Sequence, residues 1–217
     1  MSQTFAIETE RLLLRTWREG DTEPFFKICS DPEVMRHFPE PLTLHKTEKL
    51  IGMGRACLET YGVFYSPVEV KATGELIGFV GLVVHEDSNA LPIAPCIDIG
   101  WRLKRSAWGK GYASEAAAAW LRFGFETKGY EEIVSFTPAI NEPSQKVMLR
   151  LGMIRDPKED FNHPYFSKDH RLALHRLYRM SRDTWVGRSR DGAGTERCGE
   201  PLLQLGNPTE IFSEAES

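Results

Sequence analysis

The hydrophobic period of the sequence changes between residues 97 and 127, and this change limits the folds that the chain can adopt. Residues 97–103 (IDIGWRL) place an apolar side chain at every second position, which is typical of a β-strand. Between residues 111 and 127 the period becomes helical, with one stripe made of Ala113, Ala116, Ala117, Trp120, Leu121 and Gly124. A strand that passes through a short turn into a helix predicts a right-handed β-α-β crossover, and therefore an α/β fold.

The flanking segments predict the rest of a mixed sheet covered by helices on both faces. Residues 64–71 and 77–85 are rich in Val and Phe and are joined through a turn at 72–75, which predicts an antiparallel hairpin. Asp21 is expected to cap the first helix, and Gly152 is expected to end a later one. The other expected strands are 11–17, 133–137 and 172–180, and the other expected helices are 21–28, 47–59 and 143–151.

Length and charge narrow the classes of protein that fit. A chain of 217 residues with 41% hydrophobic residues is expected to form one domain, which we place at residues 1–187. Residues 188–217 lack a clear period and are expected to be a flexible tail. The net charge of -4 offers no basic field for a nucleic acid.

The sequence lacks the features of a membrane protein, of a secreted protein and of a cysteine-bound metal site. It has no apolar run approaching the ~18 residues of a membrane span, and no signal peptide is recognisable, so we expect no membrane partner and a cytoplasmic location. Four scattered cysteines form no CxxC pair, which predicts reduced thiols and no metal site.

The turn at residues 108–115 (WGKGYASE) carries the functional signal. Two glycines allow a ligand to approach the backbone, and the helix that follows presents unpaired N–H groups and its positive dipole end, which suits a pyrophosphate. A tight turn without a ligand is the alternative interpretation. A Walker A loop would need Gly at Lys104 and Ser or Thr after Lys110, and a dinucleotide fingerprint would need Gly at Ser114.

Residues 108–116 (WGKGYASEA) resemble motif A of the GNAT acetyltransferases, in the RimJ/RimL-like form WGxGYAxEA. Trp108 departs from the general superfamily pattern, which has Gln or Arg there, and this leaves phosphate binding to backbone amides. Residues 141–153, 8–15 and 175–180 resemble further segments of the same branch in the same order. The resemblance spans roughly residues 7–185, which is nearly the whole expected domain.

This resemblance implies a GNAT-like mixed, mostly antiparallel sheet with a splayed central strand pair at 97–103 and 135–139. The pantetheine arm of acetyl-CoA would enter the gap. The implied activity is transfer of acetyl from acetyl-CoA to a primary amine, on a protein N-terminus or a small molecule, by a monomer or homodimer without a metal. A non-catalytic acyl-CoA-binding or sensory module is the alternative. The cofactor contacts implied are Trp101, Leu103, Trp108, Gly109, Lys110, Gly111, Tyr112, Ala113, Ser114, Asn141 and Ser144.

Proton transfer needs a base for the ammonium group and an acid for the departing thiolate. Asp98 is the leading base because it is an acid within an otherwise apolar strand, and Glu69 is the second carboxylate; a structural hydrogen bond is the alternative role for Asp98. Ser144 matches a serine of the branch that could act near the sulfur, or could only support the helix start. His163 could line the acceptor pocket.

Overall fold

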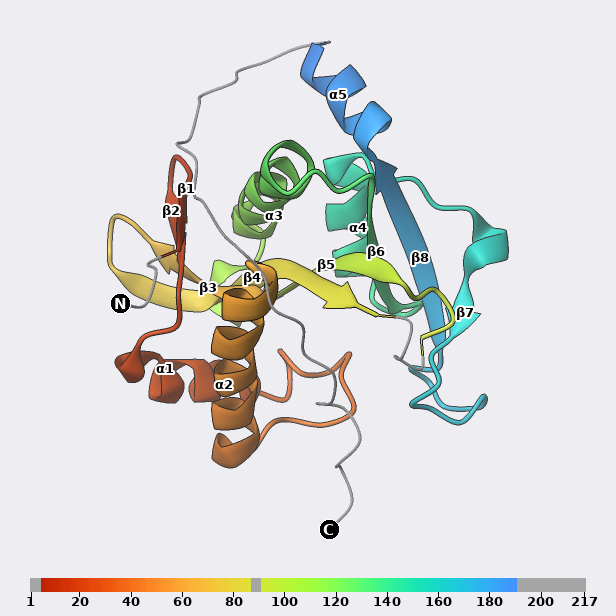
Figure 1. The fold of residues 1–217 in the computed structure, drawn as a ribbon. Coiled ribbons are helices and arrows are strands. Elements are labelled where there is room, and N and C mark those ends of the chain that lie inside the picture. The colour runs from red at the N-terminus through yellow and green to blue at the C-terminus, as the bar shows by residue number, and fades with distance from the viewer. Residues whose placement is uncertain (1–4, 87–90, 191–217) are drawn as a thin grey trace.

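The computed structural model describes residues 5–86 and 91–190, and its centre is one eight-stranded sheet (Figure 1). The spatial order of the strands is β1-β2-β3-β4-β5-β6-β8-β7. Every neighbouring pair is antiparallel except β5 and β6, which are parallel. The strands are β1 (Ala6–Glu8), β2 (Leu12–Arg15), β3 (Tyr65–Val70), β4 (Glu75–His85), β5 (Cys96–Leu103), β6 (Glu132–Pro138), β7 (Phe161–Asn162) and β8 (Leu174–Ser181).

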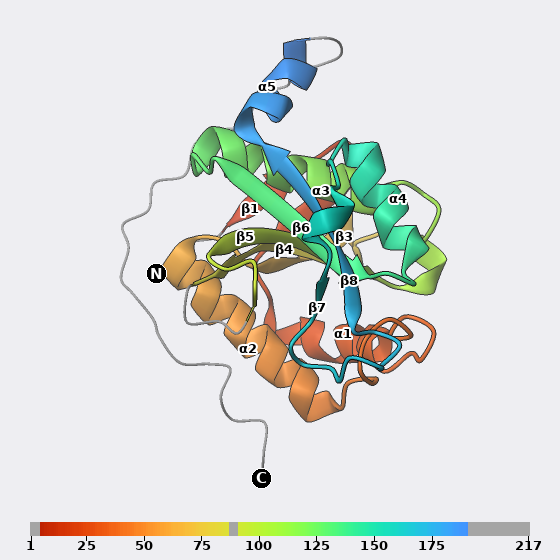
Figure 2. The same cartoon turned by 90° about the vertical axis from the view of Figure 1, so that its right-hand side faces the viewer.

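Helices cover both faces of this sheet, as Figures 1 and 2 show. The helix α3 (Tyr112–Arg122) connects the two parallel strands and packs with α4 (Glu142–Leu151) on one face. The opposite face carries α1 (Thr22–Cys29) and α2 (Leu44–Tyr61). The predicted mixed, mostly antiparallel α/β fold is therefore confirmed.

Each face has its own hydrophobic core. The larger core joins buried residues of β2, β4 and β5 to the helix α3, with Ile99 and Trp120 both fully buried. The smaller core packs Phe25 of α1 and Ile51 of α2 against Phe79 of β4. Because side chains alternate along a strand, successive residues of β5 face different cores and different parts of the site.

Local signals mark both ends of α2 and the C-terminal end of α4. Thr43 caps α2 by accepting a hydrogen bond from the Lys46 amide at 3.2 Å, and Gly62 ends that helix in the left-handed conformation. Gly152, at φ 83°, ends α4 as the sequence predicts. A π-helical turn at Phe123–Thr127 extends α3.

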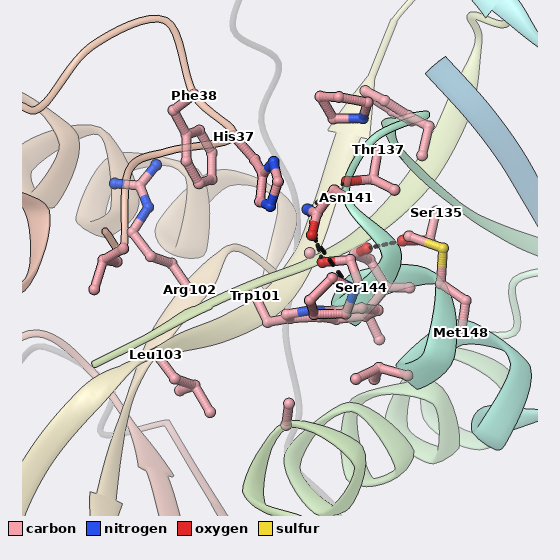
Figure 3. Close-up of a pocket in the computed structure, with 18 of the residues that line it drawn as sticks. His37, Phe38, Trp101, Arg102, Leu103, Ser135, Thr137, Asn141, Ser144 and Met148 are labelled. Atoms are coloured by element: carbon pink, nitrogen blue, oxygen red, sulfur yellow. Dashed lines mark hydrogen bonds between the residues drawn. The ribbon is translucent and has the colours of Figure 1, made fainter. Parts of the chain in front are cut away.

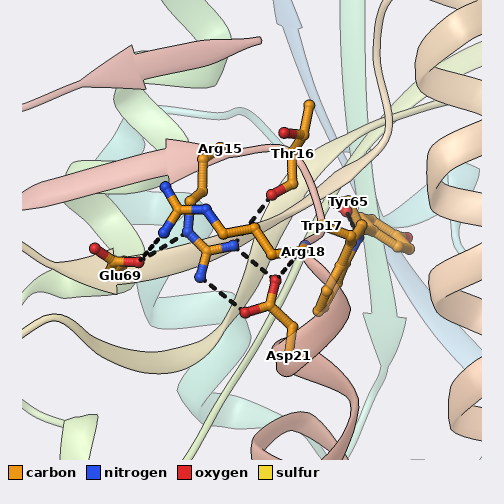
Figure 4. Close-up of polar contacts among 7 residues, drawn as sticks. All are labelled: Arg15, Thr16, Trp17, Arg18, Asp21, Tyr65 and Glu69. Atoms are coloured by element: carbon orange, nitrogen blue, oxygen red, sulfur yellow. Dashed lines mark hydrogen bonds and ion pairs between the residues drawn. The ribbon is translucent and has the colours of Figure 1, made fainter. Parts of the chain in front are cut away.

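The prediction that Asp21 caps the first helix is wrong. Asp21 stands at the start of α1, but its carboxylate does not cap that helix. Instead it accepts hydrogen bonds from the Arg15 guanidinium at 2.7 and 2.8 Å and from the Arg18 amide at 2.7 Å (Figure 4). Arg15 is only 5% exposed, so pairing this buried cation outweighs satisfying the amides of the helix.

The sequence analysis did not predict the strands β1 and β7 or the terminal helix α5 (Arg182–Arg190). The expected domain boundary at residue 187 falls inside α5, and residues 191–217 of the expected tail lie outside the described residues. In the described ranges, no helix has the length and apolar character needed to cross a lipid bilayer.

Candidate active site

A cavity of about 710 Å³ lies where β5 separates from β6. Its walls come from the loop after α1, from β5 and β6, from the turn before α3, from the start of α4 and from the loop at 163–166. Figure 3 shows Phe38 of the loop after α1, Trp101 of β5 and Ser144 of α4 around it. These segments are far apart in sequence and meet because the crossover brings β5 and β6 together. One cavity therefore extends from the glycine turn to the buried acid Asp98.

The strands β5 and β6 share a single register pair, Asp98 with Val134. Ser135 adds a side-chain hydrogen bond from Oγ to the Ile99 carbonyl at 2.7 Å, whereas the ladder of β5 with β4 continues to Leu103. Backbone groups of alternate strand residues point the same way, so the Trp101 amide and carbonyl face the gap. An extended ligand could pair with them there, as the predicted splay requires.

The glycine turn has the geometry of an anion cradle. Gly109 and Gly111 have φ of 72° and 82°, which favours glycine, and the helix α3 starts after Gly111 without a side-chain cap. The first amides of the helix, in Tyr112, Ala113 and Ser114, are thus left for a ligand. A Cβ at Gly109 would meet nothing within 4 Å, so the outer side of the turn is open.

Arg11 supports this turn from the neighbouring strand region. Its Nε donates to Glu115 at 2.6 Å, its Nη1 donates to the Lys110 carbonyl at 3.0 Å, and its guanidinium lies 4.7 Å from the Tyr112 ring centre. Burial acts to raise the pKa of Glu115, but hydrogen bonds from Thr9 and Arg11 outweigh it and lower that pKa. Glu115 is therefore ionised and neutralised by Arg11, which limits its repulsion of an anion at the helix start.

Asn141 and Ser144 form the start of α4 and line the same cavity. Asn141 donates through Nδ2 to Thr137 Oγ1 at 2.8 Å and to Ser144 Oγ at 3.1 Å, and its Oδ1 accepts from the Ser144 amide at 3.4 Å. Since the Ser144 oxygen already accepts a hydrogen bond, its own proton remains available for a ligand. Ser144 thus supports the helix start and also faces the cavity.

Asp98 is the buried acid of the cavity, at 5% exposure. Burial raises the pKa of this carboxyl, and His85 and Tyr65 partly oppose that effect. The Tyr65 hydroxyl lies 3.5 Å from Asp98 Oδ2, and His85 Nε2 lies 3.9 Å from the same oxygen. The His85–Asp98 distance is too long for a direct hydrogen bond, and His85 Nε2 is buried without a hydrogen-bond partner among the described residues.

Imidazole and phenyl rings form the wall beyond Asp98. The rings of His163 and His175 lie 4.9 Å apart, and Phe136 packs against both. Burial lowers the pKa of His175 to about 4, and burial together with His85 lowers the pKa of His163. Both imidazoles are therefore neutral near pH 7, so this wall is uncharged but can still form hydrogen bonds.

The cavity brings together nearly all residues predicted from the sequence. Lys110 is the exception among the expected cofactor contacts, since its side chain is not part of the lining. Its carbonyl accepts from Arg11 instead. The other predicted residues that line the cavity are Asp98, Trp101, Leu103, Trp108, Gly109, Gly111, Tyr112, Ala113, Ser114, Asn141, Ser144 and His163.

Glu69, the second carboxylate considered as a base, lies outside the cavity lining of the described chain. Its Oε2 accepts from Arg15 at 2.8 Å and from Arg18 at 3.3 Å (Figure 4). The side chain therefore belongs to a structural ion-pair cluster and is not placed to receive a proton from a ligand in the cavity.

Sequence reasoning missed His85, His175 and Tyr65. His85 ends a strand that was predicted correctly, and the antiparallel register sets Val83 opposite Asp98 and His85 two positions further along. An explicit register for the β4–β5 pair would have brought His85 near the acid. No local signal identifies His175, because the strand that carries it reaches the cavity only through pairing with β6 and β7.

Comparison with known proteins agrees with this geometry. The uncharacterised N-acetyltransferase p20 of Bacillus licheniformis is 32% identical over 158 residues, which cover 69% of this chain and 85% of that protein. The crystal structure of a GNAT-family acetyltransferase from Bacillus anthracis has a TM-score of 0.69 and 25% identity, covering 82% of this chain and 99% of that one.

A more distant likeness concerns the fold alone. The spermidine N-acetyltransferase of Vibrio cholerae, crystallised with CoA and spermine, has a TM-score of 0.65 and 16% identity, covering 82% of this chain and 99% of that one.

A family model provides the assignment. Residues 11–154 match the acetyltransferase (GNAT) domain, and this range starts in the strand region that supports the glycine turn and ends just after α4. With that match across more than half of its length, and with the glycine turn, the parted strands and the buried acid in one cavity, the chain belongs to the GNAT acetyltransferase family.

Proposed function

We propose that this protein transfers the acetyl group of acetyl-CoA to a primary amine, in a ternary complex and without a covalent acyl-enzyme. The observation that carries the proposal is one continuous cavity with an anion cradle at one end, an open strand edge in the middle and a buried acid at the other. A cofactor and an acceptor can occupy such a cavity together, so that the amine meets the thioester directly.

The residues at the cofactor end would bind and orient. The amides of the α3 start would hold the pyrophosphate, and the Trp101 backbone would pair with the pantetheine arm. When bound, acetyl-CoA supplies an activated acyl group as a thioester. A backbone donor facing the gap, such as the Trp101 amide, would stabilise the negative charge that develops on the carbonyl oxygen during acyl transfer.

The residues at the acceptor end would move protons. Asp98, directly or through His85, would take a proton from the ammonium group so that a neutral amine attacks. Ser144 would donate its free proton to the departing sulfur. Because its pKa is raised, Asp98 is a stronger base than an exposed aspartate and accepts a proton more readily near neutral pH.

The branch and the acceptor class are part of the proposal. The WGKGYASEA segment supports a RimJ/RimL-like enzyme, and the acceptor would be a protein N-terminus or a small amine. Reduced cytoplasmic conditions suit the free thiols of Cys29, Cys57 and Cys96. No step assigned here requires a metal.

The test is release of free thiol from acetyl-CoA by the full chain, measured across a panel of primary amines. We expect saturable thiol release that depends on one class of amine, with mass spectrometry detecting the acetylated product. Tight CoA binding without release for any amine or peptide N-terminus would favour the non-catalytic acyl-CoA-binding module instead.

A further inference from the structure

Arg102 is a buried cation of the cavity that lacks a counter-ion. The side chain is 9% exposed and belongs to the lining, and no carboxylate of the described residues forms an ion pair with it. Its Nη1 donates to Cys29 Sγ at 3.2 Å, while its buried Nε has no hydrogen-bond partner. Burial raises the pKa of Cys29, although Arg102 opposes this, so the hydrogen-bond partner that Arg102 has among the described residues is a neutral thiol.

The other buried arginine shows what is missing. Arg15 is 5% exposed and is paired with the carboxylates of Asp21 and Glu69 at 2.7 and 2.8 Å. An uncompensated buried charge is costly, so a fold normally retains it only with a partner or for a ligand. Arg102 has none of the carboxylates that stabilise Arg15, and it opens onto a cavity instead.

Two aromatic rings fix the orientation of the Arg102 guanidinium. It lies 4.1 Å from the Phe38 ring centre and 5.2 Å from that of Phe79, and Figure 3 shows it against Phe38. Cation–π contacts of this kind partly stabilise the charge and hold the planar fork in place. A planar, preoriented fork is suited to a carboxylate.

The position of Arg102 assigns it to the acceptor and not to the cofactor. Arg102 and Asp98 are four residues apart on one strand, so both side chains project from the face that carries α1 and α2. Leu103 and Ile99 project from the other face, toward α3. An acceptor with its amine near Asp98 can therefore extend an anionic group toward Arg102.

We infer that Arg102 binds a carboxylate on the acceptor, which makes the preferred substrate an amine that carries an acidic group at some distance from its nitrogen. This inference rests on the proposed function and narrows its substrate class. A polyamine acceptor is disfavoured by the same geometry, since a second ammonium group near Arg102 would be repelled.

The test compares matched acids and amides of increasing length: glycine, β-alanine, γ-aminobutyrate, ε-aminocaproate and their carboxamides. With acetyl-CoA and the full chain, we expect kcat/KM for the acid to exceed that for its amide by roughly 10- to 100-fold at the best length, which is the range for a hydrogen bond to a charged group. Arg102→Gln should remove this preference, Arg102→Lys should keep part of it, and CoA affinity should not change.

Two control variants separate the alternatives. Arg55→Gln removes an exposed cation of α2 outside the cavity lining and should leave the preference intact. Arg36→Gln removes a cavity arginine that is already paired with Glu33. A preference lost in Arg36→Gln but kept in Arg102→Gln would overturn the inference, as would a fall in CoA affinity in Arg102→Gln.

Calorimetric titration of the same compounds into CoA-saturated protein makes the test independent of turnover. Thiol release with equal rates for acid and amide would overturn the role of Arg102 and leave the proposed function standing. Binding of the acid, but not of its amide, without any thiol release would support the role of Arg102 and remove the proposed function. Because this comparison uses the wild-type chain, it holds even if Arg102→Gln does not fold.

Discussion

The two ends of the cavity are built in different ways. The proposed cofactor end lies mainly along one stretch of sequence, the turn at 108–114 and the edge of β5 that precedes it. The acceptor end consists of side chains from distant elements: Tyr65 on β3, His85 on β4, Asp98 and Arg102 on β5, and His175 on β8. The first end is therefore recognisable in a short segment of sequence, whereas the residues of the second come together only in the folded chain.

The two ends also differ in where their charge comes from, main-chain groups at one and side chains at the other. Unpaired amides and a helix dipole favour an anion at the cofactor end without any buried side-chain charge. The acceptor end contains a buried acid, a buried arginine and two neutral imidazoles, whose properties depend on burial. Backbone changes should therefore affect cofactor binding, and side-chain changes should affect turnover and its dependence on pH.

The largest effect is expected for Gly111→Pro. The native φ of 82° is incompatible with the φ near −65° that proline imposes, so the turn cannot keep its shape. CoA affinity measured by calorimetry should fall by more than about 100-fold. Gly74→Pro is the matched control, because Gly74 has φ 66° in the β3–β4 turn outside the cavity lining. It should lose stability but retain CoA affinity, and equal CoA losses in both variants would point to misfolding.

Asp98→Asn should lower kcat/KM by roughly 100-fold near neutral pH with little change in CoA affinity, since it removes a base but preserves shape. In the wild type, activity should rise as the pH increases through the raised pKa of Asp98, because only the ionised form accepts a proton. Higher pH should restore much of the variant's rate, as more amine is then neutral. Asp183→Asn, an exposed acid of α5, should have no effect. An unchanged rate and pH profile in Asp98→Asn would assign proton removal to His85 or solvent.

The neutral imidazole of His175 predicts a loss of stability in acid. The folded state holds this pKa at about 4 against an ordinary 6.5, so between these values the unfolded state binds more protons. The contribution of His175 to the free energy of unfolding is therefore at its maximum above about pH 6.5. It decreases as the pH falls and is lower by about 2 kcal/mol at about pH 5. Urea unfolding at both pH values should show this loss in the wild type.

His175→Phe keeps a ring in place and cannot titrate, so its free energy of unfolding should decrease by about 2 kcal/mol less on acidification than that of the wild type. His45→Gln, an exposed change on α2, should leave the wild-type pH dependence intact. Identical slopes for the wild type and His175→Phe would show that this imidazole is protonated in the folded state.

The smallest effect is expected for Arg11→Gln. Loss of the guanidinium releases the Lys110 carbonyl and leaves the Glu115 charge uncompensated at the helix start. Both changes disfavour a bound anion, but Arg11 is 43% exposed, so solvent screening limits the effect to a roughly 3- to 10-fold weaker CoA affinity. Arg18→Gln, which removes an exposed arginine paired with Glu69, should not change CoA affinity. If CoA affinity increases in Arg11→Gln, the turn does not depend on this support.

The glycine turn and most of the fold could be predicted from the sequence alone. The change of period at 97–127, the hairpin at 64–85 and the glycine stop at Gly152 are local signals, because turns, caps and strand alternation depend on neighbouring residues. The glycines of the turn were recognisable for the same reason. Ser144 and Asn141 could be placed because a helix start is itself a local structure.

The proposed acceptor end could not be predicted, because it depends on contacts that form only in the folded chain. Strand register set His85 beside Asp98, the β7–β8 pairing placed His175 against His163, and the loop after α1 placed Phe38 beside Arg102, which also lies against Phe79. The tertiary structure also keeps Glu69 out of the cavity: this carboxylate has the same chemistry as Asp98 but pairs with Arg15 on another part of the sheet. Burial, pKa and the presence of a counter-ion arise from contacts between segments far apart in the chain, and sequence spacing does not specify those contacts.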